Sequence, residues 1–147
     1  MSVYVEVVHE ATDEVAAAMR HLLPQLSANA AWPDQAAVQR IVGSEATTLL
    51  AAKLDGQIVG LLALAMFPIP TGLRAWIEDV IVDEAARGQG IGAALTKEAL
   101  ALAEAAGART VDLTSRPSRE AAGRLYERLG FAARSTRIYR YTFGRTA

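Results

Sequence analysis

Apolar positions change their spacing several times along the 147-residue chain, and each change marks a different kind of element. Short runs rich in β-branched, aromatic and aliphatic residues predict strands, whereas apolar residues three and four apart predict helices. The expected strands are residues 3–8, 47–54, 57–67, 74–83, 111–114, 131–134 and 137–143. The expected helices are residues 12–23, 33–43, 90–106 and 118–129. The resulting order, β-α-α-β-β-β-α-β-α-β-β, predicts a single α/β domain over residues 1–147.

Capping and turn residues suggest where these elements begin and end. Thr12 and Ser118 are expected N-caps, because a hydroxyl oxygen can accept a hydrogen bond from a free amide of the first helical turn. Pro24 is expected to stop or kink the first helix. The dipeptide Asp55-Gly56 lies between two apolar runs, which is a strong hairpin signal, and residues 68–72 read as a turn-rich loop.

Composition narrows the classes of partner. The chain is 52% hydrophobic, and its 15 basic against 16 acidic residues give a net charge of −1, so we expect neither nucleic acid nor a membrane surface as a partner. The longest apolar stretch, residues 58–70, is too short to span a bilayer. With no targeting segment evident, a cytoplasmic location is expected. Zero cysteines exclude disulfides, thiolate zinc sites and a cysteine nucleophile, and no His, Asp and Glu cluster has metal-ligand spacing, so no metal is expected.

A glycine-rich loop joins the fourth expected strand to the long third helix. Gly88, Gly90 and Gly92 let a ligand approach backbone amides closely, and the first turn of a helix offers unpaired N–H donors to an anion. Arg87 can add charge-assisted hydrogen bonds to phosphate oxygens. The alternative is a loop that needs glycine only for its turn. Two nucleotide motifs fit poorly, because position 95 is Leu95 instead of the third dinucleotide glycine and the Gly-Lys-Ser/Thr of a P-loop is absent.

Two segments carry a family resemblance. Residues 87–92, Arg-Gly-Gln-Gly-Ile-Gly, resemble the Arg/Gln-x-x-Gly-x-Gly/Ala signature of the GNAT superfamily of acyl-CoA-dependent N-acetyltransferases. Residues 77–82 look like its central strand, and residues 118–131 are similar to its second motif, ending Leu-Tyr-x-x-x-Gly-Phe. The resemblance is specific over residues 50–143 and loose over 1–46. It implies a mixed, mostly antiparallel sheet flanked by helices, and transfer of an acetyl group from acetyl-CoA to a primary amine of a small molecule or peptide.

The resemblance also implies which residues bind acetyl-CoA. Backbone amides of the glycine loop would hold the pyrophosphate, and the main chain of the central strand would pair with pantetheine. One strand amide would polarise the thioester carbonyl and stabilise the oxyanion. Arg119 stands where the family often has an asparagine; it is a candidate contact for the coenzyme or its 3′-phosphate, with solvent exposure as the alternative. The coenzyme-binding candidates are Val80, Ile81, Val82, Arg87, Gly88, Gln89, Gly90, Ile91, Gly92, Ala93 and Arg119.

The same resemblance suggests the catalytic residues. Tyr126 occupies the position of the family tyrosine that donates a proton to the coenzyme sulfur; the alternative is a core aromatic beside the apolar pair Leu125 and Leu129. Glu78 and Asp79 interrupt an apolar strand, where a buried carboxylate is costly without a partner. Adjacent strand residues point to opposite faces, so the two carboxylates are not expected to do the same job. Some family members carry a similar Glu-Asp pair here, and that resemblance implies Glu78 as the base, acting through water. We expect Asp79 to be a substrate or structural contact, with an ion pair to an arginine as the alternative.

Some features leave the function open. A non-catalytic acyl-CoA-binding or regulatory domain is the alternative function, and a nucleotide-binding module is a weaker third. His9 and His21 lie outside both motifs and are not expected to be catalytic. Trp32 is expected near the acceptor pocket and Trp76 in the core. Dimerisation is common in the family, and the strand 137–143 is apolar enough to pair with a second copy or to be covered, so a homodimer is one candidate assembly. Without cysteine, no cysteine-bound acyl intermediate forms, which favours direct attack in a ternary complex.

Overall fold

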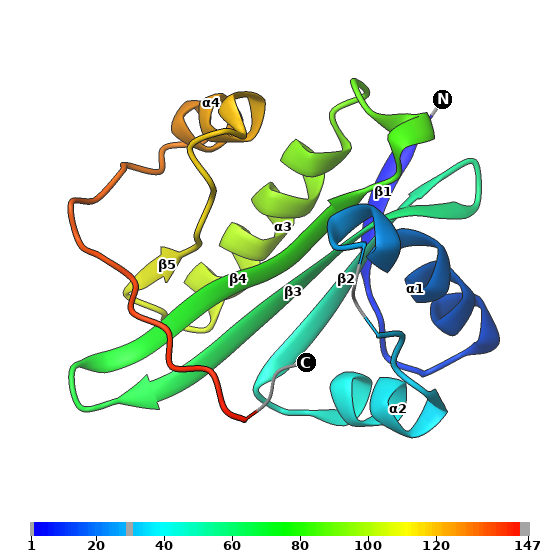
Figure 1. Cartoon of the computed structure of the whole chain (residues 1–147), viewed down its shortest axis with the longest axis horizontal. Coiled ribbons are helices and arrows are strands. Elements are labelled where there is room, and N and C mark those ends of the chain that lie inside the picture. The colour runs from blue at the N-terminus through cyan, green and yellow to red at the C-terminus, as the bar shows by residue number, and fades with distance from the viewer. Residues whose placement is uncertain (1, 29–30, 145–147) are drawn as a thin grey trace. The chain divides into compact units, whose positions relative to one another are not determined.

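The computed structural model describes residues 2–28 and 31–144, and the chain divides into two compact units, Met1–Thr114 and Ser115–Ala147. The first unit is built on a five-stranded sheet in which the strands lie side by side in sequence order (Figure 1). β4 and β5 are parallel, and the other neighbours are antiparallel, as expected for a mixed, mostly antiparallel sheet. The strands are β1 (Val3–Val7), β2 (Thr47–Leu54), β3 (Gln57–Ile69), β4 (Gly72–Val82) and β5 (Thr110–Asp112).

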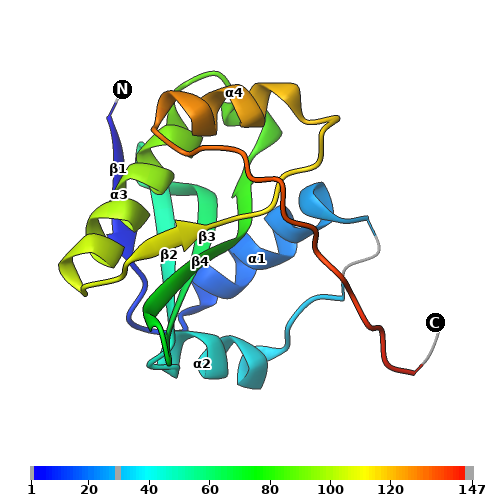
Figure 2. The same ribbon diagram turned by 90° about the vertical axis from the view of Figure 1, so that its left-hand side faces the viewer.

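Helices cover both faces of this sheet. Figure 2 shows α1 (Asp13–Leu26) and α3 (Ile91–Ala105) on opposite faces, and α2 (Gln35–Gly43) follows α1 along the chain. On the face of α1 and α2, Leu22 and Val38 are fully buried in one apolar cluster with residues of β2, β3 and β4. Two side-chain caps start these helices: Thr12 Oγ1 accepts from the Val15 amide at 3.2 Å, as predicted, and the Asp34 carboxylate accepts from the Ala37 amide at 2.8 Å.

Several boundaries differ from the expected ones. The hairpin at Asp55-Gly56 is confirmed, with both residues at positive φ (52° and 81°) as a tight primed turn requires. α1 continues past Pro24 and ends at Leu26, within one turn of the proline. β3 and β4 extend into the segment expected to be a loop, so the turn between them is shorter than residues 68–72.

The second unit contains α4 (Glu120–Arg128). Its N-cap is Arg119 and carries no side-chain capping bond, so the prediction of Ser118 as the cap is wrong. The two final strands, expected at residues 131–134 and 137–143, are also absent from the described residues. Composition supplies only the propensity for a strand, which forms through hydrogen bonds to a partner strand, and no strand pairing includes these residues. The observed order is therefore β-α-α-β-β-β-α-β-α.

Among the described residues, no helix is long and apolar enough to cross a membrane. In the same part of the chain, no group of three or more His, Cys, Asp and Glu residues is arranged to hold a metal ion.

Candidate active site

The central strand β4 is distorted where its two carboxylates stand. Ala63 pairs with Glu78 and Leu61 pairs with Ile81, so β4 has one more residue than β3 between these pairs. Asp79 lies in this β-bulge with φ at 50°, in the left-handed region that aspartate tolerates better than most residues. The bulge interrupts the regular alternation on which the expectation of opposite faces for Glu78 and Asp79 depended.

The outer edge of β4 is open beyond its first half. β5 pairs with β4 only at three positions, the last being Trp76 with Asp112, while the pairing with β3 continues to Val82. Within the described part of the first unit, no strand pairs with the outer edge of residues 77–82. A short segment of strand therefore presents backbone donors and acceptors that have no strand partner.

Hydrogen bonds indicate which backbone groups this edge offers. The Asp83 amide donates to the Val59 carbonyl at 2.8 Å, so the backbone at this position faces β3. Because backbone groups alternate in direction along a strand, those of Ile81 also face β3, whereas those of Val80 and Val82 face the open edge. The Arg87 side chain agrees with this direction, since its Nε donates to the Val82 carbonyl at 3.4 Å.

The glycine loop leads from the end of β4 into α3. A single 3-10 turn (η1, Glu84–Ala86) is followed by exposed residues from Arg87 to Gly90. Gly90 is the N-cap of α3, with φ at 78°, and no side chain caps this helix, unlike α1 and α2. The first-turn amides of α3, which lack intrahelical acceptors, are therefore free of side-chain caps. Such a terminus suits an anion.

A polar network ties α1 to the beginning of this loop. His21 Nε2 lies 3.0 Å from Asp83 Oδ2, and Gln25 Nε2 donates to Asp83 Oδ1 at 3.4 Å. The Glu84 amide donates to Gln25 Oε1 at 2.9 Å, and the Ala85 amide donates to Asp83 Oδ1 at 3.2 Å. Burial alone would raise the pKa of Asp83, but these hydrogen bonds and the charge of protonated His21 outweigh burial and lower the pKa. Sequence reasoning missed this network; its only signal is the i, i+4 spacing of His21 and Gln25 on one helical face.

An apolar cavity of about 450 Å³ lies between the sheet and α1, α2 and their connection. Asp79 is the only ionisable residue in the described part of its lining. Ala31 and Pro33 also line it, and Trp32 between them is 57% exposed. Residues 29 and 30 of this connection lie outside the described residues. The lining residues are Met19, Leu23, Leu26, Ser27, Ala31, Pro33, Ile41, Thr47, Leu49, Leu61, Ala63, Asp79 and Ile81.

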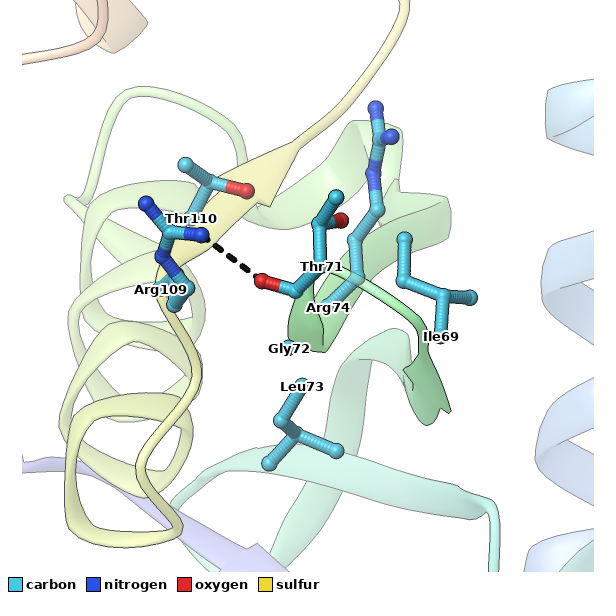
Figure 3. A pocket seen from close by; sticks show the side chains of 7 residues that line it. All are labelled: Ile69, Thr71, Gly72, Leu73, Arg74, Arg109 and Thr110. Atoms are coloured by element: carbon cyan, nitrogen blue, oxygen red, sulfur yellow. Dashed lines mark hydrogen bonds between the residues drawn. The ribbon is translucent and has the colours of Figure 1, made fainter.

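A smaller pocket of about 220 Å³ lies at the other end of β4, beside the β3–β4 turn (Figure 3). There Arg109 donates a hydrogen bond to the Thr71 carbonyl at 2.7 Å. Arg74 pairs with Asp112 across the parallel strands and lies 5.5 Å from the ring centroid of Trp76. This pocket is separated from the glycine loop by the length of β4, roughly 30 Å for a strand rising about 3.3 Å per residue. Its contacts fasten the start of β5 to β4.

In the second unit, Tyr126 lies on α4, and its ring packs edge-to-face against Phe131 with centroids 5.7 Å apart. The Phe131 amide also donates to the Tyr126 carbonyl at 3.0 Å, which turns the chain at the end of the helix. Burial raises the pKa of Tyr126, and the nearby Arg119 charge opposes that rise in pKa only in part. The hydroxyl therefore keeps its proton throughout the neutral range.

Comparison with known proteins identifies the class. The Acetyltransferase (GNAT) family matches residues 14–131, and the chain belongs to this family. Membership implies an acetyltransferase activity, with acetyl-CoA as co-substrate and an amine as acceptor.

Individual proteins resemble this chain in sequence or in fold. N-alpha-acetyltransferase 30 of Schizosaccharomyces pombe is 41% identical over 71 residues, and the match spans 48% of this chain and 47% of that protein. A transcriptional regulator from Bacillus halodurans is similar in structure, with 28% identity, a TM-score of 0.82, and coverage of 97% of this chain and 100% of the other. A ribosomal-protein-alanine N-acetyltransferase from Brucella melitensis has 25% identity and a TM-score of 0.78, at the same coverages.

Proposed function

We propose that this enzyme transfers an acetyl group from acetyl-CoA to a primary amine by direct attack in a ternary complex. The observation that carries the proposal is the continuity of two features on one strand. The open edge of β4 runs directly into a glycine loop and a helix N-terminus without a side-chain cap. The first feature suits the amide groups of pantetheine, and the second suits the pyrophosphate.

Each backbone segment has a proposed partner on the coenzyme. The outward groups of Val80 and the outward amide of Val82 pair with pantetheine as an added strand would, while the Val82 carbonyl accepts from Arg87. The intervening Ile81 keeps the edge in place through β3. Amides of residues 88–93 hold the pyrophosphate, and Arg87 adds a charge beside it. Arg119, which precedes α4, is the proposed contact for the coenzyme phosphates from the second unit.

The chemistry requires one proton to leave the amine and one to reach the sulfur. The amine nitrogen attacks the thioester carbonyl carbon, the C–N bond forms, the C–S bond breaks, and CoA leaves as a thiol. Glu78 is the proposed base, accepting the amine proton through a water molecule. Tyr126 is the proposed acid, and the raised pKa of its hydroxyl keeps the proton available to the departing sulfur. Asp79 is the proposed contact for the acceptor.

Two relatives bear names that describe polypeptide acceptors, N-alpha-acetyltransferase 30 and ribosomal-protein-alanine N-acetyltransferase. A polypeptide N-terminus therefore belongs beside small amines among the acceptors to be tried.

Calorimetric titration with acetyl-CoA and with CoA tests the proposal. We expect heat of binding and an upward melting shift with both, and no comparable effect with ATP or NAD. The absence of binding to either coenzyme form would overturn the proposal. Turnover is then followed with a thiol reagent, which detects only released CoA because the protein contains no cysteine.

A further inference from the structure

We propose that the acceptor is a primary amine with an apolar substituent, and that the cavity between the sheet, α1 and α2 holds that substituent while Asp79 holds the ammonium group. This inference rests on the proposed function, because it names the acceptor class of the same site. The acidic pair Glu78-Asp79 alone suits any cationic amine, and the cavity is the feature that narrows the class.

The walls of the cavity carry the first part of the inference. Ten of the thirteen lining residues have hydrocarbon or thioether side chains, and no basic residue is among them. Met19 and Leu49, which line it, are also members of the buried cluster on this face of the sheet. Leu23 and Leu26 pack against that cluster only partly buried. The cavity is thus continuous with the apolar core on this face of the sheet. An apolar group that enters it removes apolar surface from water.

The size of the cavity is the second part. Its volume of about 450 Å³ lies within the range of small-molecule sites, roughly 300–1,000 Å³. At about 30 Å³ per water molecule, it has room for roughly 15 waters, which find few polar partners on these walls. A ring or branched chain displaces them and gains contact with the walls. A polyamine or sugar instead leaves its own polar groups without partners there.

The position of the charge is the third part. Among the described residues that line the cavity, Asp79 is the only ionisable one. It belongs to the bulge of the strand whose open edge is the proposed pantetheine site. Glu78, the proposed base, pairs in register with Ala63, which lines the same cavity. A carboxylate attracts an ammonium group, whereas the hydrocarbon chain of a long acyl donor forms no favourable interaction with it. The amine nitrogen is therefore placed at the sheet, with the substituent extending toward α1 and α2.

The substrate series tests this class directly. With acetyl-CoA fixed, kcat/KM is measured for 2-phenylethylamine, putrescine and glucosamine, and for tetrapeptides that begin with leucine or with serine. We expect 2-phenylethylamine to exceed both polar amines by about tenfold or more, since one or more buried methylenes are worth that factor. The peptide pair shows whether the same apolar preference extends to polypeptide N-termini.

Two variants test the cavity and the charge separately. Ala63→Leu places a larger side chain in the cavity, and we expect it to raise KM for 2-phenylethylamine roughly tenfold. Ala101→Leu makes the same change at an exposed position of α3 and serves as the matched control. Asp79→Asn removes the charge but keeps a residue that tolerates positive φ; we expect it to raise KM for every amine.

A binding signal independent of turnover comes from Trp32, which is 57% exposed beside the lining residues Ala31 and Pro33. In a Trp76→Phe background, where Trp32 is the remaining tryptophan, 2-phenylethylamine should shift its fluorescence to shorter wavelength, and putrescine should not.

The possible outcomes separate the two proposals. If CoA does not bind, the proposed function itself fails. If CoA binds but putrescine or glucosamine is preferred, the function stands and the apolar class is overturned. The class is also overturned if Ala63→Leu changes the preference for acyl-CoA chain length and leaves the KM for amines unchanged, because the cavity then holds the acyl group. If Ala63→Leu does not fold, the substrate series and Asp79→Asn still decide.

Discussion

Gly60 on β3 is the position where a single methyl group should disturb the proposed coenzyme site without touching it. A Cβ added there would lie 3.0 Å from Ile91 Cγ2, 3.1 Å from the Ile81 carbonyl oxygen and 3.1 Å from Leu95 Cδ1. Ile91 and Leu95 are 1% and 0% exposed, so neither side chain can move aside freely. The first two turns of α3 must therefore shift away from the sheet in Gly60→Ala.

The size of the effect follows from these contacts. Ordinary carbon contacts begin near 3.4 Å, so three neighbours, one of them backbone, must each give by a few tenths of an ångström. Overpacking of this kind costs about 1–3 kcal/mol in the free energy of unfolding. In a chain of this length, each kcal/mol corresponds to a melting temperature lower by roughly 2–4 °C. Because α3 begins at Ile91, we also expect several-fold weaker binding of CoA.

Thermal unfolding with and without CoA measures both effects. The matched control is Gly43→Ala, since Gly43 has no atom within 4 Å of an added Cβ and ends α2. Alanine there should be neutral or stabilising by up to about 1 kcal/mol. If Gly60→Ala has the same melting temperature as Gly43→Ala and binds CoA equally well, then close packing of α3 against Gly60 does not determine the conformation of the coenzyme loop, and the reasoning is refuted.

Three further predictions concern the loop, the network and the acid. Gly90→Ala, at φ 78° with open space around it, should cost about 1–2 kcal/mol by backbone strain alone and reduce the CoA-induced melting shift; an unchanged shift would contradict the loop assignment. The pKa of Asp83 is lower in the folded protein than in the unfolded chain. The Asp83 carboxylate therefore stabilises the folded protein fully at pH values above its unfolded pKa, near 4, and this stabilisation is lost as the pH falls through its folded pKa. Asp83→Asn should therefore lose about 1 kcal/mol at pH 7 and show a flatter acid unfolding profile than the parent, whereas parallel profiles would oppose the assignment. Tyr126→Phe should lower kcat about 100-fold with CoA affinity nearly intact; a large loss of affinity at unchanged turnover would remove Tyr126 as the acid.

The sequence predicted elements whose signals are local. Thr12 capping α1 and the Asp55-Gly56 hairpin depend on residues next to each other in the chain, and both are confirmed. The prediction of the two final strands was wrong for the opposite reason. Residues 137–143 have the composition of a strand, but a strand also depends on a partner, and composition carries no information about partners.

The candidate site, like the fold, could be predicted only where its signals are local in the sequence. The spacing of its glycines predicts the glycine loop. The bulge at Asp79, in contrast, depends on the register between β3 and β4, which is set by pairing over many residues. The His21–Asp83 contact joins positions 62 residues apart. No local pattern encodes that contact. The apolar cavity is likewise lined by α1, α2, the connection between them and three strands, which only the fold brings together.

Two independent requirements act on residue 79 in the bulge. Its backbone, at φ 50°, favours glycine, asparagine or aspartate, whereas the proposed ammonium contact requires a carboxylate. Glutamate meets the second demand but not the first, and asparagine meets the first but not the second. Aspartate alone meets both, so selection for activity in a mutant library should leave Asp79 nearly invariant, while selection for folding alone should admit asparagine and glycine.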